Sequence, residues 1–85
     1  MSSSERRNAI NSYLIELSLL AKRLCPDSMI EVTTEAFEYE DGHVRFYPSA
    51  RSSEAEITDI EGKLAARCFD ISVETEVLIR SAVYD

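Results

Sequence analysis

The chain has 85 residues, 45% of them hydrophobic, and a formal net charge of −7. The length predicts one small domain over residues 1–85, and the apolar content is too high for an intrinsically disordered chain. Residues 26–85 carry fourteen acidic and five basic side chains, which disfavours direct binding to nucleic acid or to anionic membranes.

Cysteine usage and the N-terminal sequence point to the cytoplasm. Cys25 and Cys68 have no CxxC spacing, which excludes a zinc knuckle and a thioredoxin-type motif. We expect two small buried thiols in a reducing compartment, and a disulfide between them is the less favoured alternative. The sequence has no apolar signal region and no run of 18 apolar residues, so no membrane segment is predicted.

The first predicted element is a helix over residues 5–24. Ser2 and Glu5 have the spacing of a capping box, and Pro26 stops the helix. Ile15 and Leu19 widen the apolar stripe beyond what one neighbour requires, so we expect a second contact, with another helix or another subunit. The stripe itself has helical spacing, at Ile10, Tyr13, Leu14, Leu17, Leu20, Ala21 and Leu24.

Residues 29–48 predict a β-hairpin around Asp41-Gly42, a preferred pair for a two-residue type I′ turn. That turn sets the cross-strand pairs Glu40–His43, Tyr39–Val44, Glu38–Arg45, Phe37–Phe46 and Ala36–Tyr47, with aromatic residues on one face and opposite charges on the other. We expect Phe37 and Phe46 to pack on the helices.

The first strand of this hairpin contains a conflict of parity. Ile30 and Val32 share one parity, whereas Phe37 and Tyr39 have the other, so a straight strand would place the two apolar sets on opposite faces. Either a β-bulge near residues 33 to 36 resets the parity, or both faces of the sheet are covered.

The second predicted helix covers residues 54–67. Ser53 and Glu56 form another capping box, and Ile57, Ile60, Leu64, Ala65 and Cys68 give the helical stripe. Gly62 lies inside this helix, and we interpret it as a point of close packing on the sheet.

The last segment alternates Phe69, Ile71, Val73, Thr75, Val77 and Ile79 with mostly polar residues. This period of two predicts a strand over residues 70–80. A new helix capped at Ser72 is the competing interpretation.

The predicted fold is a two-layer α+β domain with the order α-β-β-α-β. We expect a three-stranded sheet of order 2-1-3 with two helices on one face. The order of elements resembles that of the type II K-homology fold, which binds RNA through a GxxG loop. The chain contains no GxxG, so the resemblance is one of topology.

No catalytic, metal-binding or cofactor-binding residue is assigned. His43, the only histidine, is expected to be an exposed cross-strand partner of Glu40. The carboxylates of Glu35, Glu38, Glu40 and Asp41 are expected to form a solvated charged face rather than an acid/base or cation site. Tyr39 and Tyr47 should lie on opposite faces with acidic neighbours, which disfavours a base-stacking platform.

These observations favour a non-enzymatic acidic binding or regulatory protein that acts through protein–protein contact as a homodimer. The uncovered face of the sheet is expected to present an apolar patch. The candidate interaction residues are Ile15, Leu19, Ile30, Val32 and Tyr47. The alternative is an acidic inhibitor or nucleic-acid-mimicking decoy, for example phage-encoded against a nucleic-acid-handling defence protein. A small enzyme using His43 and the hairpin carboxylates is the third and least favoured class.

Overall fold

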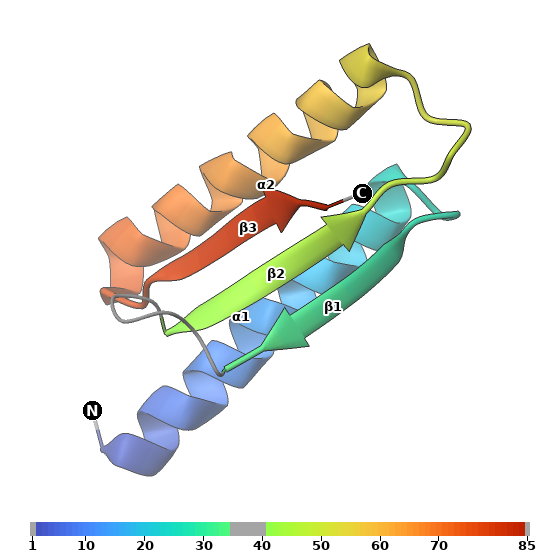
Figure 1. The fold of residues 1–85 in the computed structure, drawn as a ribbon. Helices are drawn as coiled ribbons and strands as arrows, with labels where there is room; N and C mark the ends of the chain where they lie inside the picture. The colour runs from blue at the N-terminus through green and yellow to red at the C-terminus, as the bar shows by residue number, and fades with distance from the viewer. Residues whose placement is uncertain (1, 35–40, 85) are drawn as a thin grey trace.

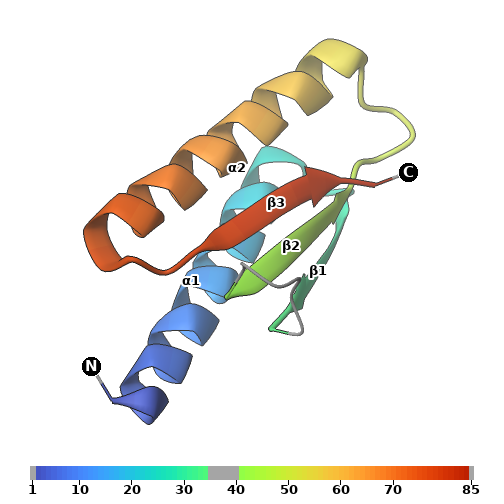
Figure 2. The ribbon, with the colours of Figure 1, turned by 60° about the vertical axis from the view of Figure 1, so that its left-hand side comes forward.

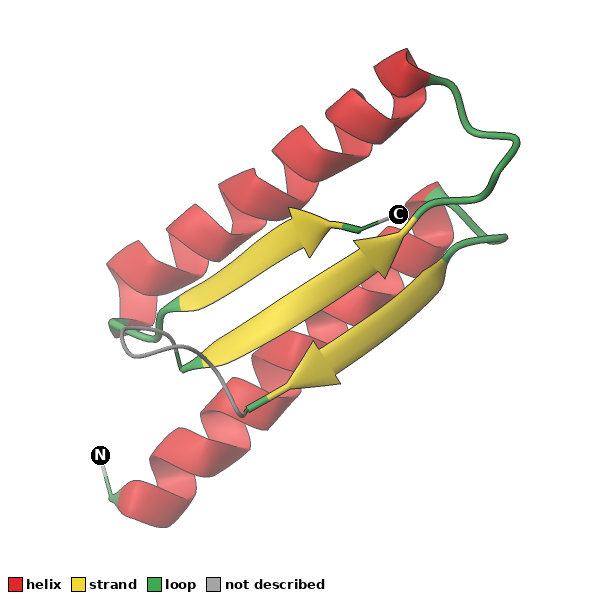
Figure 3. Cartoon of the chain, in the orientation of Figure 1, coloured by secondary structure: helices red, strands yellow, loops and turns green. Residues whose placement is uncertain are grey.

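The computed structural model describes residues 2–34 and 41–84 and shows a two-layer α+β fold, as predicted. Three strands form one mixed sheet, and two helices lie side by side on one of its faces (Figures 1 and 3). The helices run in opposite directions, and the start of the first extends beyond the sheet. The elements in chain order are α1 (Ser3–Leu24), β1 (Met29–Thr33), β2 (Gly42–Tyr47), α2 (Glu54–Thr75) and β3 (Ile79–Val83).

Both predicted helix caps are confirmed, and α1 begins at Ser3, two residues before its predicted start. The Ser2 hydroxyl accepts a hydrogen bond from the Glu5 N–H at 3.2 Å, and the Ser53 hydroxyl accepts one from the Glu56 N–H at 3.1 Å. These bonds satisfy amide groups that have no partner inside the helix. Neither helix in the described part of the chain is long and apolar enough to span a bilayer.

The predicted strand over residues 70–80 is wrong in its first half, because α2 continues to Thr75. Ile71 is fully buried and extends the helical stripe of Leu64 and Cys68 by one turn. Phe69 and Val73, which the alternation placed on the buried side, are each 67% exposed. The alternative helix start at Ser72 is also wrong, since Ser72 lies within α2.

α2 ends at Thr75, shortly before β3 begins. Glu76 adopts a left-handed conformation with φ of 61°, and its N–H donates to the Ser72 carbonyl. This is a common way to terminate a helix. The chain then enters β3 at Ile79, so the third strand exists but is shorter and later than predicted.

The strand pairing of the hairpin differs from the predicted register. β1 pairs antiparallel to β2 with Met29 opposite Tyr47, Ile30 opposite Phe46, Glu31 opposite Arg45, Val32 opposite Val44 and Thr33 opposite His43. The predicted partners Ala36, Phe37, Glu38, Tyr39 and Glu40 lie outside the described residues. The observed register sets Ile30 and Val32 on the same side as Phe46 and Val44, so the apolar residues of both strands face the helices.

Asp41-Gly42 is therefore not the centre of a two-residue turn. No glycine has positive φ, so Gly42 lacks the conformation that a type I′ turn requires. Its role is close packing: a Cβ at this position would lie 3.1 Å from Cδ2 of Leu14. The glycine allows α1 to approach the first residue of β2.

The strand order is 1-2-3, which corrects the predicted order 2-1-3. β3 pairs parallel to β2, with Gly42 opposite Ile79 and Phe46 opposite Val83. β2 is the most buried strand, since Val44 and Phe46 have no exposed surface, and this explains its central position. Phe46 packs in the core as predicted.

The core lies between the sheet and the two helices. Its buried side chains are Leu14, Leu17, Ala21, Cys25, Val44, Phe46, Ile60, Leu64, Cys68, Ile71, Val77 and Ile79. Both thiols are buried and free, as expected from the sequence. The core is thus built from every described element except β1, whose Ile30 packs against its edge.

Gly62 does not contact the sheet, which corrects the close-packing interpretation. It is exposed on α2, and a Cβ built there meets nothing within 4 Å.

We expect Gly62→Ala to raise the free energy of unfolding by about 1 kcal/mol, because alanine loses less backbone entropy in a helix. Urea titration at the lowest practical protein concentration measures the free energy of unfolding.

Gly42→Ala is the matched control for that substitution. Its new methyl group meets Leu14, so it should destabilise the fold or leave the urea midpoint unraised. Equal stabilisation by both alanines would contradict the assignment of the two glycines.

Candidate interaction surfaces

The five residues predicted to form an interaction surface lie in three different places. Ile15 and Leu19 are 58% and 64% exposed on the side of α1 that faces away from the core. Ile30 packs against the core, and Val32 is partly exposed on the edge strand β1. Tyr47 lies on the face of the sheet that the helices leave open. Two of these three places, the outer side of α1 and the open face of the sheet, are separate candidate surfaces.

The first surface is the outer side of the helical layer, which we call the helical face. Besides Ile15 and Leu19 it contains Phe69 and Val73 of α2. Both helices lie on the same side of the sheet (Figure 2), so these four side chains point away from it together. Sequence reasoning missed Phe69 and Val73 because it took α2 to end at residue 67.

An ion pair joins the two helices beside this face. The Arg67 guanidinium donates to Glu16 from Nε at 2.5 Å and from Nη2 at 3.0 Å, a two-point contact with the carboxylate. The bond from Arg67 lowers the pKa of Glu16, and the carboxylate raises the pKa of Arg67 in return. The planar fork fixes the helices at one relative height along their axes.

The second surface is the open face of the sheet. Side chains alternate along a strand, so His43, Arg45 and Tyr47 point away from the buried Val44 and Phe46. Tyr84, which follows β3, contacts all three: its ring lies 5.7 Å from the Tyr47 ring and 5.5 Å below Cζ of Arg45. This face is largely polar and aromatic, unlike the apolar patch expected from the sequence.

His43 is buried, which corrects the expected exposed position opposite Glu40. Its exposed fraction is 6%, and its Nε2 lies 3.1 Å from the Tyr84 hydroxyl oxygen. The rings meet edge to face at 6.1 Å. Tyr84 therefore covers the histidine from the solvent side. No local pattern indicates this contact, because 41 positions separate the two residues in the chain.

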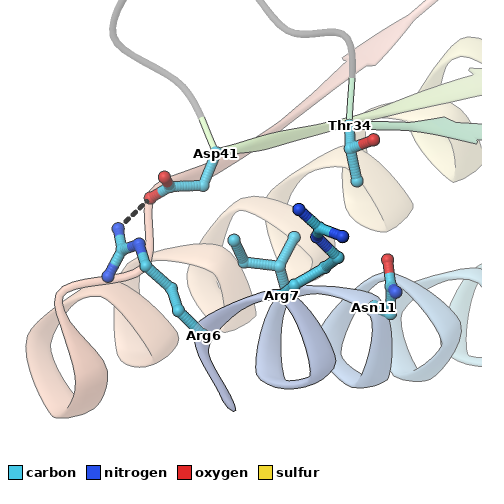
Figure 4. A pocket seen from close by; sticks show the side chains of 6 residues that line it. Arg6, Arg7, Asn11, Thr34 and Asp41 are labelled. Atoms are coloured by element: carbon cyan, nitrogen blue, oxygen red, sulfur yellow. Dashed lines mark hydrogen bonds and ion pairs between the residues drawn. The ribbon is translucent and has the colours of Figure 1, made fainter. Parts of the chain in front are cut away.

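A hollow of about 370 Å³ lies at the start of α1. Nη2 of Arg6 bonds Oδ2 of Asp41 at 2.8 Å, and Arg7 reaches across the hollow toward Thr34 (Figure 4). The lining residues are Arg6, Arg7, Ile10, Asn11, Thr34 and Asp41. Thr34 and Asp41 flank residues 35–40, which lie outside the described part of the chain, and we assign no ligand to the hollow.

Within residues 2–34 and 41–84, no three histidine, cysteine, aspartate or glutamate side chains come together as metal ligands would. Of the predicted acidic face, Asp41 is the one carboxylate inside the described residues, and it is bonded to Arg6 and to the Leu78 N–H. Comparison of the chain with protein-family models, curated proteins and solved structures finds no match.

The contact between Tyr84 and His43 makes a prediction about stability. Tyr84→Phe keeps the ring but removes the hydroxyl from a buried partner, so it should lower the free energy of unfolding by about 1–2 kcal/mol. Chemical denaturation measures the change. Tyr13→Phe is the control, because the Tyr13 hydroxyl has no hydrogen-bond partner among the described residues. An equal loss in both variants would contradict the assigned bond.

The two buried thiols have different surroundings. The Ser49 backbone N–H and the Ser52 hydroxyl, 3.6 Å from Sγ, lower the pKa of Cys25. Burial raises the pKa of Cys68, an effect that the Ser81 hydroxyl only partly offsets. Because the thiolate is the reactive form, reactivity should appear at lower pH for Cys25 than for Cys68.

We therefore expect iodoacetamide to alkylate Cys25 first as the pH is raised under native conditions. Peptide mass spectrometry quantifies both sites, and the difference should disappear in urea, where the two thiols share one environment. Earlier labelling of Cys68 in the folded protein would contradict the assigned surroundings.

Proposed function

We propose that this chain is a non-enzymatic acidic binding protein that acts in the cytoplasm through protein–protein contact and forms a homodimer. The observation that supports it is the helical face, where Ile15, Leu19, Phe69 and Val73 are each more than half exposed. Large apolar side chains exposed on one side of a soluble protein usually mark an interaction site. A domain of this size also gains stability from association.

The surroundings of His43 support a non-enzymatic role. A general base must reach the proton that it removes, but the His43 ring is buried and its Nε2 is in contact with Tyr84. Its position on the sheet is explained by packing against that tyrosine. The net charge of −7 supports a protein partner over direct contact with nucleic acid.

Sedimentation equilibrium over a range of micromolar concentrations tests the proposal. We expect an apparent mass that rises from 9.6 kDa toward twice that value. Because both copies carry a charge of −7, added salt should screen their repulsion and strengthen the dimer. A mass of 9.6 kDa at every concentration and salt level would reject the homodimer.

The second candidate function is that of an acidic decoy for a basic protein groove. The observation in its favour is that every carboxylate of α2 is exposed along one 22-residue helix. These are Glu54, Glu56, Asp59, Glu61, Asp70 and Glu74. A decoy needs negative charges held on a rigid element to compete with nucleic acid phosphates, and these six lie on one helix.

Salt distinguishes the two functions by the sign of its effect. A decoy should bind a basic probe such as poly-lysine more tightly than a flexible polyglutamate of equal charge does, and should lose that affinity steeply as salt is added. Binding no tighter than that of the flexible control contradicts the decoy function. Strengthening of self-association by salt supports the homodimer.

A further inference from the structure

The part of the helical face contributed by α2 is a regular stripe that combines small and large residues. Gly62, Ala66, Phe69 and Val73 follow one another at intervals of four, three and four residues, so they lie on one side of the helix. This is the spacing of a helix–helix seam. All four residues are exposed, and the opposite side of α2 forms the core stripe.

We propose that this stripe is the seam of an antiparallel, two-fold homodimer in which α2 packs along α2 of a second copy, with Phe69 over Ala66 and Val73 over Gly62. The inference rests on the protein–protein association proposed above and specifies its surface and geometry. A two-fold contact is isologous, so one stripe must supply both the large side chains and the places that receive them.

The steric match follows from the spacing of the stripe. In an antiparallel pair, each step forward along one helix is a step backward along the other. Val73 stands four residues after Phe69, and Gly62 stands four residues before Ala66. When Phe69 lies over Ala66, Val73 therefore lies over Gly62. Each large side chain meets a small one, and the two-fold axis repeats both contacts. An exposed glycine in mid-helix, which otherwise weakens the helix, is explained by this arrangement.

The charges beside the stripe favour the same alignment. Lys63 and Asp70 are seven residues apart and lie on one flank. Lys63 bonds Asp59 of its own helix at 2.8 Å, and the alignment brings Asp70 of the other copy beside the same ammonium group. The neighbouring alignment, with Ala66 over Gly62, would set Phe69 over the carboxylate of Asp59 and Lys63 beside Lys63. Both contacts of that alternative are unfavourable, so charge and shape favour the first of these two alignments.

Helix α1 extends the seam without changing the symmetry. The Glu16–Arg67 pair holds Ile15 at the height of Ala66 and Phe69, so the two-fold axis passes near Ile15 and the two copies of α1 also meet. Two helices, each about 33 Å long and about 10 Å wide, offer a contact area of about 600 Å² per copy. The total of about 1,200 Å² is at the lower limit for a specific dimer.

Exchange of seam residues for glutamate tests the surface. Phe69→Glu and Val73→Glu should each raise the dimer dissociation constant about 30-fold or more in sedimentation equilibrium. Their circular dichroism should stay unchanged, because both side chains are exposed in one copy. Met29→Glu is the control, since Met29 is 63% exposed on β1, outside the helical face, and should leave the dissociation constant unaltered.

The outcomes separate this inference from the proposed function. A dimer that survives Phe69→Glu but is lost in Met29→Glu overturns the seam and keeps the homodimer. A wild-type protein that stays monomeric overturns both. Loss of the dimer in Phe69→Glu and Val73→Glu alone supports the seam.

Charge exchange tests the antiparallel alignment. Lys63→Asp and Asp70→Lys should each weaken the dimer severalfold, and the double variant should recover most of the wild-type affinity, because the pair is restored across the axis with reversed signs. A double variant that is weaker than either single one overturns the alignment.

Discussion

Strand β2 has to occupy the centre of the sheet, because its side chains are buried on both faces. Val44 and Phe46 pack under the helices, while His43 is covered on the open face by Tyr84. An edge position would leave one row of its backbone groups without partners. The other strands are arranged around this requirement: β1 pairs antiparallel on one side, and β3 pairs parallel on the other.

Asp41 connects the elements that meet at the beginning of β2. Its carboxylate accepts bonds from Arg6 of α1 and from the Leu78 N–H, both at 2.8 Å, and its own N–H donates to the Leu78 carbonyl at 2.6 Å. The parallel strand is thereby joined to β2 at the end where no turn connects them. Because Asp41 is partly buried, these bonds are less screened than those of an exposed pair.

The two layers of the fold have opposite surface characters. The open face of the sheet, where apolar residues were expected, carries a histidine, an arginine and two tyrosines in mutual contact. The helical face instead exposes large apolar side chains. Sequence periodicity finds the buried stripe of each helix, but the importance of its other side appears only when both helices lie in one layer that no other described element covers. The proposed association therefore uses the helices and leaves the tyrosines on the sheet.

Local signals in the sequence determined both helix starts, the first helix, the fold class and the burial of the two thiols. Each depends on contacts within a few residues or on strong helical periodicity, as at Ser2 and Ser53.

Tertiary contacts decided the hairpin register, the length of α2, the strand order, and the positions of His43 and Gly62. Asp41-Gly42 favours a tight turn locally, but the structure pairs Ile30 with Phe46 and Val32 with Val44, so the apolar residues of β1 share the face of the sheet that the helices cover. Ile71 fits a strand or a helix by spacing alone, and only its burial beside Leu64 and Cys68 selects the helix, because the free energy of burial depends on neighbours that lie far away in the chain.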